Sequence, residues 1–419
     1  MSLLRYWIWL STIPGLSLRG QLRLLDSFYS PEAIYLADRR ALEDSGALTK
    51  NEIALIERRD FSLADKVLEE CRRKGIRILT MQDAAYPRRL MSIDMPPPVL
   101  YYKGNLPAFD NLPSVAVVGS RNASGYGLLT AKRMGMQLGA CGGTVISGAA
   151  KGIDTMALEG ALSTDSPVIA VLGNGLDVVY PRSAERLYKD VERNGCLLSE
   201  FIPGTKPLGG NFPRRNRIMS GLALGVLVVE AAKKSGSLIT AEYALEQGRD
   251  VFAVPGNIGL ACCEGSNELI RDGAYLVTCG WDVLQLYKAQ FPEQLHRWNG
   301  GDRLTLSPHD RAYIEDDMEP EQSGTKDPPG EAPGEKRIDN AAKSHYIDLE
   351  QIMDSLTQDE QVLMRILQGG RLHVDDLIAR SGMPAARVLS SLTLLEIKGY
   401  VQQHPGKRFG LILLPDKNL

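Results

Sequence analysis

The residues of this chain best suited to bind a charged ligand are concentrated in one stretch near its middle, between Glu200 and Glu230. No acidic residue lies between these two glutamates. Guanidinium and ammonium groups pair with phosphates, and an aromatic ring offers a surface on which a nucleobase can stack. The stretch therefore predicts a site for phosphate or nucleic acid, with a solvated basic loop as the alternative. Its cations and its ring are Lys206, Arg214, Arg215, Arg217 and Phe212.

Two kinds of local structure are expected within this stretch. Proline and glycine interrupt residues 206–212, which predicts a loop there. The apolar run at 226–229 predicts a buried strand. We therefore expect a cationic loop that is anchored to a strand in the core.

The elements that must position this loop are predicted from the alternation of patterns over residues 113–280. Short apolar runs rich in β-branched residues predict strands, and helical patterns separate them. This alternation is typical of a parallel sheet covered by helices on both faces, which is an α/β fold of the Rossmann type. The predicted strands are residues 115–118, 144–146, 168–172, 226–229 and 251–254.

A turn rich in glycine or serine follows most of these predicted strands. In open parallel sheets such turns gather at the carboxyl edge, where ligands bind and helix N-termini offer unpaired amides. Arg121 and Lys151 stand in or beside two of the turns. The sequence therefore predicts one phosphate-binding crevice, lined by the turns and by the basic stretch. These turns include Gly119-Ser120-Arg121, Ser147-Gly148, Gly173-Asn174-Gly175, Ser235-Gly236-Ser237 and Pro255-Gly256-Asn257.

Two common uses of a glycine-rich crevice do not fit these residues. A nicotinamide site needs Gly-x-Gly-x-x-Gly after the first strand and an acidic residue at the end of the second, and neither is present. The P-loop string Gly-x4-Gly-Lys-Ser/Thr is also absent. Residues 1–295 contain no histidine, so this region supplies no histidine base or nucleophile. Asp154 and Asp177 are candidate acids or bases, although capping of a helix N-terminus is the simpler interpretation of Asp154.

Composition places the chain among multidomain globular proteins. Its 419 residues exceed one ordinary core, and a net charge of −3 means that any nucleic-acid site must be a local patch. The six cysteines show no Cys-x-x-Cys spacing and no flanking histidine, which argues against a zinc site and favours buried, reduced thiols. No apolar run reaches transmembrane length, and residues 1–18 are expected to be a packed helix rather than a signal peptide. We expect a cytoplasmic protein without a cofactor or a membrane partner.

Three further segments flank this core. Residues 1–85 are expected to form a small helical domain, whose Ile13-Pro14-Gly15-Leu16 is either a helix-hairpin-helix turn or a plain turn. The α/β domain is assigned to 86–290, beginning with a proline-rich extended segment in which helix is not expected. Residues 291–349 are predicted to be a disordered acidic linker. Residues 350–419 predict three helices and a wing, a winged helix whose third helix is too poor in cations for a typical DNA reader.

As a set, the motifs of residues 86–280 resemble the bacterial DNA-processing protein A family (DprA, also called Smf). The matching segments include Val118-Gly119-Ser120-Arg121, Ser147-Gly148 with Gly152-Ile153-Asp154, and the run from Asn211 to Ile218. They also include Ser235-Gly236-Ser237 and Val254-Pro255-Gly256. The chain departs from the family pattern at Ala149, Lys151 and Leu158, where glycine, arginine and histidine are usual.

The resemblance implies a protein that binds single-stranded DNA during natural transformation and is not an enzyme. Such a protein protects the incoming strand, loads the RecA recombinase and helps to displace single-strand-binding protein. The resemblance also implies an extended Rossmann fold and a homodimer. The DNA contacts that we predict are Gly119, Ser120, Arg121, Ser147, Gly148, Lys151, Lys206, Asn211, Phe212, Arg214, Arg215, Asn216 and Arg217.

Two alternatives remain open at the level of sequence. Rossmann-like phosphoribohydrolases, which act on nucleoside monophosphates, share this layout, and Glu242 would then be a remnant of their catalytic glutamate. The other alternative is an interaction protein whose working part is the winged helix.

Overall fold

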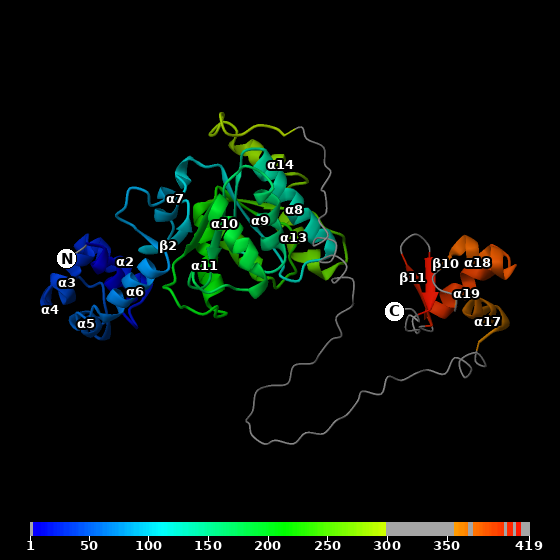
Figure 1. Ribbon diagram of the computed structural model, residues 1–419, viewed down its shortest axis with the longest axis horizontal. Helices are drawn as coiled ribbons and strands as arrows, with labels where there is room; N and C mark the ends of the chain where they lie inside the picture. Colours follow the sequence, from blue (N-terminus) through cyan, green and yellow to red (C-terminus); the bar gives the residue numbers. More distant parts are fainter. Residues whose placement is uncertain (1–2, 299–355, 368–371, 398–399, 405–407, 412–419) are drawn as a thin grey trace, which may run out of the picture. The chain divides into compact units, whose positions relative to one another are not determined.

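The computed structural model describes residues 3–298, 356–367, 372–397, 400–404 and 408–411. The described residues fall into two compact units, one within residues 1–323 and one within 324–419. Figure 1 shows the first as helices around a large sheet and the second as a small unit with a short sheet. In the first unit Phe291 and Leu295 are buried, so packed chain continues to Trp298. The rest of the predicted linker lies outside the described residues.

Within residues 3–298, nine strands form one sheet in the order β1-β2-β6-β5-β4-β3-β7-β8-β9. Strands β3 to β9 pair in parallel, and β1 and β2 add an antiparallel edge. The predicted Rossmann-like α/β fold is therefore confirmed, and β1, β2, β6 and β9 are strands that the sequence patterns did not predict. The bounds are β1 (Arg77–Thr80), β2 (Val99–Gly104), β3 (Ser114–Val118), β4 (Thr144–Ser147), β5 (Val168–Leu172), β6 (Gly195–Ser199), β7 (Gly225–Val228), β8 (Asp250–Ala253) and β9 (Tyr275–Leu276).

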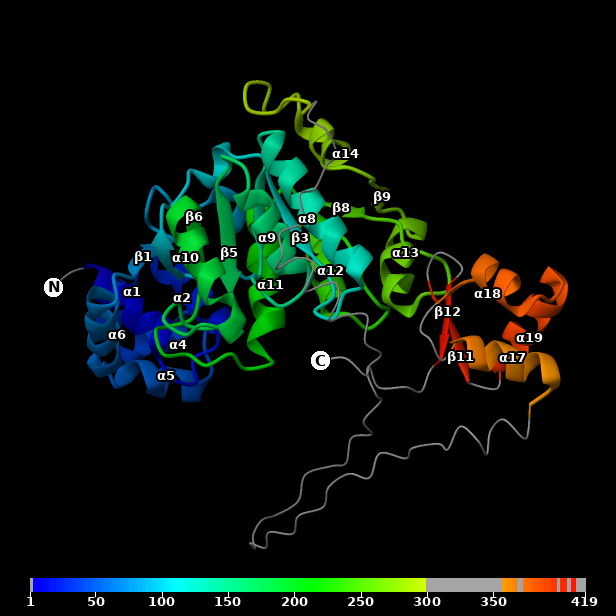
Figure 2. The ribbon, with the colours of Figure 1, turned by 45° about the vertical axis from the view of Figure 1, so that its right-hand side comes forward.

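Alternating side chains of the strands fill two cores, one on each face of the sheet. Val115 and Val117 of β3 belong to the core shared with α8, α9, α10 and the N-terminal helices. Ala116 and Val118 belong to the core shared with α11, α12 and residues 86–93. Figure 2 shows the helices on both sides of the strands. The helices are α8 (Gly125–Ala140), α9 (Ile153–Leu162), α10 (Glu185–Asn194), α11 (Asn211–Leu222), α12 (Gly236–Glu246), α13 (Glu264–Arg271) and α14 (Gly280–Leu284).

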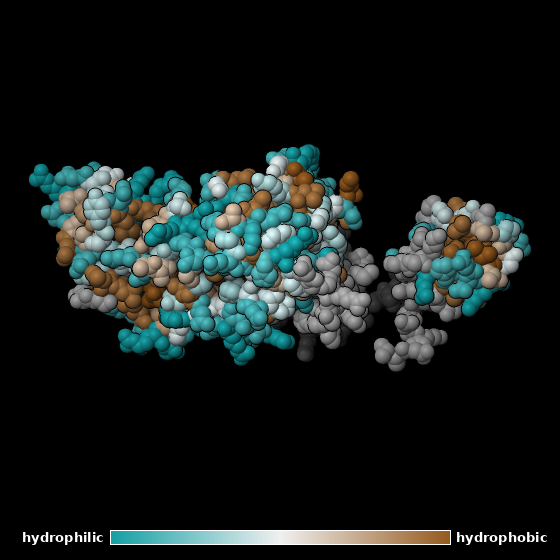
Figure 3. All heavy atoms as spheres, turned by 90° about the horizontal axis from the view of Figure 1, so that it is seen from above, coloured by the Kyte–Doolittle hydropathy of each residue, from teal (hydrophilic) through white to brown (hydrophobic). Residues whose placement is uncertain are grey.

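The N-terminal helices are short because capping residues interrupt the chain repeatedly. Ser17, Ser30, Asp38 and Thr49 each accept a backbone amide at the start of a helix. The first helix buries Trp9 and is packed, as predicted. Figure 3 shows apolar side chains at the surface of this part, among hydrophilic ones. The helices are α1 (Leu3–Thr12), α2 (Leu18–Phe28), α3 (Pro31–Leu36), α4 (Arg39–Asp44), α5 (Lys50–Glu57) and α6 (Ser62–Arg73).

The proline-rich segment that follows consists of turns and bends up to Pro98 and of strand β2 after it, and the prediction that it contains no helix was wrong. A single helical turn, α7 (Arg88–Met91), begins directly after Pro87. Proline is compatible with this position because the first residues of a helix need no amide donor. The turn buries Leu90 against the sheet and so brings the segment onto the core.

The second unit is a winged helix, as predicted. Three helices enclose a core around Leu363, Leu377 and Leu392. Gly382 ends the second helix in the left-handed conformation. A two-residue strand, which the sequence did not predict, completes the sheet of the wing. The elements are α17 (Gln358–Leu367), β10 (Leu372–His373), α18 (Val374–Ser381), α19 (Ala385–Ile397), β11 (Val401–His404) and β12 (Arg408–Leu411).

No helix in the described part of the chain has both the length and the apolar character needed to cross a bilayer.

Candidate nucleic-acid interface

The topology of the sheet creates a crevice beside β3. The chain builds β3, β4, β5 and β6 in one direction across the sheet, and β7, β8 and β9 in the other. The order therefore reverses between β3 and β7, and ligands of open α/β sheets bind at such a reversal, outside the carboxyl ends of the strands. A cleft of about 580 Å³ lies there. We call it the switch-point cleft, and among its lining residues are Gly119, Ser120, Arg121, Asp154, Tyr180, Phe212, Arg215, Asn216, Ser235, Gly236, Ser237 and Thr240.

The turn after β3 is fixed by backbone contacts to its neighbours. The amide of Ser120 donates to the carbonyl of Glu230 over 2.8 Å, and its carbonyl accepts from the amide of Ile153 over 3.2 Å. A Cβ atom at Gly119 would lie 2.5 Å from the side chain of Ile153, so only glycine permits this close approach. The turn therefore presents the exposed side chain of Arg121 at the wall of the cleft.

Phe212 and Arg121 form a pair within the cleft. The guanidinium carbon of Arg121 lies 4.6 Å from the centroid of the Phe212 ring, within the range of a cation–π contact. The ring centroid of Tyr180 lies 5.7 Å from that of Phe212. Phe212 is half-buried and packs against Gly173, where a Cβ atom would come within 2.9 Å of the ring. The ring is thus held on one side by the protein and lies beside a movable cation.

Helix α11 begins at Asn211, so the loop predicted over 206–212 was wrong for its last two residues. The arginines predicted to lie on a loop stand on this helix instead, and its geometry separates them. Residues 215–217 are buried, whereas Arg214 is exposed. The interpretation of the stretch as a solvated basic loop is therefore wrong for Arg215 and Arg217.

Arg215 lies beneath the turn that follows β4. The residue is 3% exposed. Its guanidinium donates one hydrogen bond to the carbonyl of Val171 and another, from Nε, to Asn216 Oδ1 over 3.1 Å. It lies so close to Gly148 that a Cβ atom there would meet Nη1 at 2.1 Å. Burial lowers the pKa of Arg215, and the charge of Asp154 opposes this shift. Arg215 therefore gives the floor of the cleft a positive charge, since an arginine remains protonated.

The start of the turn after β4 is buried in the protein interior. The Ser147 hydroxyl donates to the carbonyl of Val117 over 2.7 Å, and both Ser147 and Gly148 are buried. The Gly148 amide donates to the Asp154 carboxylate over 3.1 Å. Asp154 does not cap its helix, because Gly152 holds the N-cap position, so the capping interpretation was wrong. Burial raises the pKa of Asp154, against the opposing effects of Arg215 and the backbone amides.

Ala149 in the same turn has a φ of 51°. This left-handed conformation favours glycine, because a Cβ atom costs energy there. The strain gives a physical reason why this position suits glycine, from which the present chain departs.

Arg214 and Arg217 are not among the residues that line the switch-point cleft. Both bind the carboxylate of Glu200, at 3.0 Å and 2.5 Å. They line a second cavity of about 610 Å³ together with Leu18, residues 92–95 and residues of α12. The structure thus divides the predicted cationic cluster between two sides of α11.

The remaining predicted residues stand outside the cleft lining. Lys151 and Lys206 are exposed, and the Asn211 side chain donates to the Lys206 carbonyl over 3.3 Å. The two lysines therefore supply mobile charge near the turns that flank the cleft.

Sequence reasoning missed several residues of the cleft. Tyr180 and Thr240 line it but were not predicted. The predicted turn from Ser235 to Ser237 does line the cleft, although its residues were not among the predicted DNA contacts. The argument that turns after parallel strands meet at one edge placed this turn in the crevice, and it could equally have added these residues to the predicted DNA contacts. Tyr180 carries a weaker signal, as an aromatic residue beyond the turn that follows β5.

Two comparisons identify the relatives of this architecture. A family model described as DNA recombination-mediator protein A matches residues 77–288. A second model, described as the DprA winged helix domain, matches residues 349–407. The first matched range contains the lining of the switch-point cleft, and the second contains the winged helix from α17 to β11.

Individual relatives show the same similarity. Protein Smf of Synechocystis sp. is 32% identical over 410 residues, which cover 96% of this chain and 98% of the relative. The DNA processing protein DprA of Streptococcus pneumoniae is 47% identical over 204 residues, covering 48% of this chain and 71% of the relative. A crystal structure of DprA from Streptococcus pneumoniae superimposes with a TM-score of 0.61 at 38% identity, covering 68% of this chain and 98% of that one.

Proposed function

The chain belongs to the DNA recombination-mediator protein A family, and from this premise we propose that it binds single-stranded DNA in the switch-point cleft and delivers that strand to a recombinase of the RecA type. The observation that carries the proposal is the pair formed by Arg121 and Phe212, which stand 4.6 Å apart on the cleft wall. An arginine beside an aromatic ring supplies one group for a phosphate and one for a base.

The chemistry of the cleft favours a nucleic-acid strand over a small anion alone. Among the residues that the structure describes, the charged ones that line the cleft are two arginines, Arg121 and Arg215, and one acid, Asp154. The electrostatic potential in the cleft is therefore positive. The Ser235–Ser237 turn at the start of α12 adds hydroxyls and helix N-terminal amides that can donate to phosphate oxygens. Phe212 and Tyr180 add apolar area for bases. A duplex keeps its base faces stacked, so only an unpaired strand can use these rings.

The structure gives no specific support for the phosphoribohydrolase alternative. Glu242 is exposed on α12 and does not line the switch-point cleft. A catalytic carboxylate must come within hydrogen-bond reach of the reacting atoms. We therefore propose a binding protein rather than an enzyme.

The winged helix is proposed to serve protein contact or packing. Arg387 of α19 pairs with Asp359 of α17 at 2.6 Å. A cation held by an acid is less available to a phosphate. We further propose a cytoplasmic homodimer that protects the strand and helps to displace single-strand-binding protein, as the family resemblance implies.

The test of the DNA site is fluorescence anisotropy of a labelled dT oligonucleotide across a salt series, for wild type and Arg121→Ala. Each lost phosphate contact reduces the slope of log K against log salt by about 0.7. We expect the Arg121→Ala slope to be lower by about this amount. The matched control is Arg186→Ala, because Arg186 is a highly exposed arginine on α10 away from the cleft lining. Equal slopes for wild type and Arg121→Ala would refute the proposed site.

A further inference from the structure

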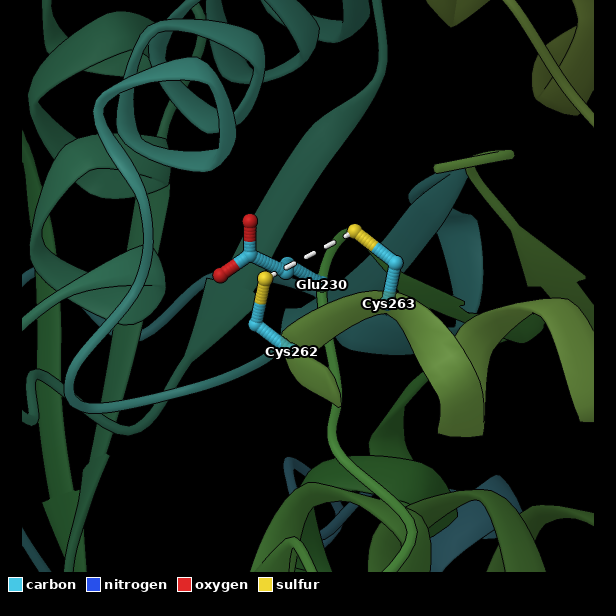
Figure 4. A group of neighbouring side chains, drawn as sticks. All are labelled: Glu230, Cys262 and Cys263. Carbon is cyan, nitrogen blue, oxygen red and sulfur yellow. Dashed lines mark hydrogen bonds between the residues drawn. The ribbon is translucent and has the colours of Figure 1, made fainter. Parts of the chain in front are cut away.

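A cluster of soft and hard ligand atoms lies behind the turn that follows β3. Glu230 stands just beyond the carboxyl end of β7, and Cys262 and Cys263 lie in the short helix η3 (Ala261–Cys263). One carboxylate oxygen and the two sulfur atoms all lie within 4.8 Å of one another. Figure 4 shows the Cys262 sulfur directed toward the Glu230 carboxylate. Among the described residues, this is the one group of three such side chains at this spacing.

The separation of the two sulfur atoms matches a metal-bound pair. They lie 3.8 Å apart. With a Zn–S bond of about 2.3 Å and tetrahedral angles, two thiolates on one zinc ion are about 3.8 Å apart. One zinc ion could therefore bind both sulfur atoms without any change in the distance between them. A carboxylate oxygen on the same ion would lie about 3.5 Å from each sulfur, and the Glu230 oxygen lies within 4.8 Å of both.

The carboxylate is already oriented by partners of the kind that surround metal ligands. The Ser124 amide donates to Glu230 Oε1 over 2.9 Å, and the Ser124 hydroxyl donates to Oε2. Two carboxylate oxygens offer about four lone-pair positions, so each oxygen keeps one for a cation. Hydrogen bonds of this type fix the direction of metal ligands in proteins.

The alternative fate of the two thiols, a disulfide, is disfavoured by backbone geometry. Adjacent Cα atoms lie about 3.8 Å apart across a trans peptide, whereas disulfides usually need about 4.4 Å or more. The surroundings instead leave space for separate sulfur atoms. A Cβ atom at Gly256 would lie 2.4 Å from the Cys263 sulfur, so glycine makes the room for it.

We propose that Glu230, Cys262 and Cys263 bind one thiophilic divalent cation of the zinc and cadmium class. Two thiolates and a carboxylate supply three ligands, and a water molecule would complete a tetrahedral set. The argument from Cys-x-x-Cys spacing misses this site because its ligands come from two separate segments. The proposal does not depend on DNA binding.

The site would connect two elements beside the switch-point cleft. The carbonyl of Glu230 accepts the amide of Ser120, next to Arg121. A cation bound here would tie η3 to the end of β7 and so to this turn. Binding to the folded state alone also raises stability by mass action.

The test is titration of the reduced full-length protein with Cd²⁺, followed by the ultraviolet charge-transfer band of cadmium thiolates. We expect saturation at one equivalent, with Zn²⁺ displacing Cd²⁺. Cys262→Ser should abolish the one-equivalent step, and Glu230→Gln should weaken it at least about tenfold. Cys279→Ser is the matched control, because Cys279 is another half-buried cysteine that is not part of the cluster, and it should titrate like wild type.

Three results would overturn the proposal. These are the absence of a saturable band in wild type, an unchanged titration of Cys262→Ser, or an unchanged titration of Glu230→Gln. Thermal unfolding without metal establishes that each variant is folded. If Glu230→Gln does not fold, Cys262→Ser decides the matter alone.

Discussion

Replacing Phe212 by alanine isolates the contribution of base stacking. The ring is half-buried, and its exposed neighbour Arg121 lies 4.6 Å from its centroid. A base can stack on the ring only if the guanidinium moves away. The same movement frees Arg121 to contact the phosphate of the stacked nucleotide. Phe212→Ala removes the stacking surface and also the contact that a base must displace.

The expected loss follows from these two opposing effects. Stacking of one base on an aromatic residue contributes about 1–3 kcal/mol. Displacing an exposed cation–π contact costs about 0.5–1 kcal/mol, which wild type incurs and the variant does not. From the middle of each range, the net loss for Phe212→Ala is about 1.3 kcal/mol, or about 8-fold in Kd. Phe212→Trp keeps a stacking surface and should bind within about threefold of wild type.

The assay is anisotropy of a dT oligonucleotide at fixed salt. Phe201→Ala is the matched control, because Phe201 is also half-buried and also lies beside an arginine, with Arg214 at 5.4 Å from its centroid. Phe201 does not line the switch-point cleft, so its loss should leave Kd unchanged. Equal affinity of Phe212→Ala and wild type would refute the stacking assignment, as would an equal loss for Phe201→Ala.

Three further predictions concern stability. Glu200→Ala should lower the free energy of unfolding by about 3 kcal/mol in urea titrations, because it leaves the buried Arg217 without its carboxylate. Glu185→Ala breaks an exposed ion pair and should have little effect, so similar values for the two variants would contradict the account. Gly135→Ala should lower the free energy of unfolding by about 1–3 kcal/mol, because its Cβ would lie 2.0 Å from the Ala157 carbonyl. Gly209→Ala is the control, because a Cβ there meets no atom within 4 Å. A Gly135→Ala protein as stable as wild type would show that α8 and α9 are not in such close contact. Hydrogen bonds from Arg73 and Lys74 lower the pKa of Glu70 to about 2, and the pKa of Asp177, which burial raises, is brought below its usual value by Lys74 and the Gly204 amide. A lowered carboxylate pKa gives stability that is present above the unfolded-state pKa and is lost as the pH falls through the folded-state pKa. The urea concentration at the unfolding midpoint should therefore decrease as the pH is lowered from about 4 to about 2, and it should decrease less steeply in Lys74→Met. Identical pH profiles for the two proteins would argue against this network.

The central strands could be predicted because their residues satisfy both faces of the sheet at once. Apart from Ser114 and Gly225 at their starts, strands β3, β5 and β7 are runs of valine, isoleucine, leucine and alanine, which is typical of strands buried on both faces. Strand β2 instead contains Tyr102 and Lys103, which tolerate partial exposure at the edge of the sheet. Its membership depends on antiparallel pairing with β1 and β6, which only the folded chain reveals.

The sequence predicts a cluster of cationic residues, but not that α11 divides them between two cavities. The sequence patterns place Arg121 and Phe212 in one predicted site, and the structure brings these two side chains into contact. The patterns cannot tell which arginine of a cluster faces inward, because that depends on the start of α11 at Asn211. The partner of Arg217 is Glu200, an acid at the border of the cationic stretch that forms its pair only once β6 and α11 are packed.

The claim that a single strand occupies the switch-point cleft can be tested most directly by photocrosslinking. A dT oligonucleotide that carries 5-iododeoxyuridine is irradiated with the full-length protein, and the crosslinked peptides are identified by mass spectrometry. The account predicts crosslinks to Phe212 or Tyr180, which are lost when both are replaced by leucine. Crosslinks confined to the winged helix, within residues 356–411, would contradict it.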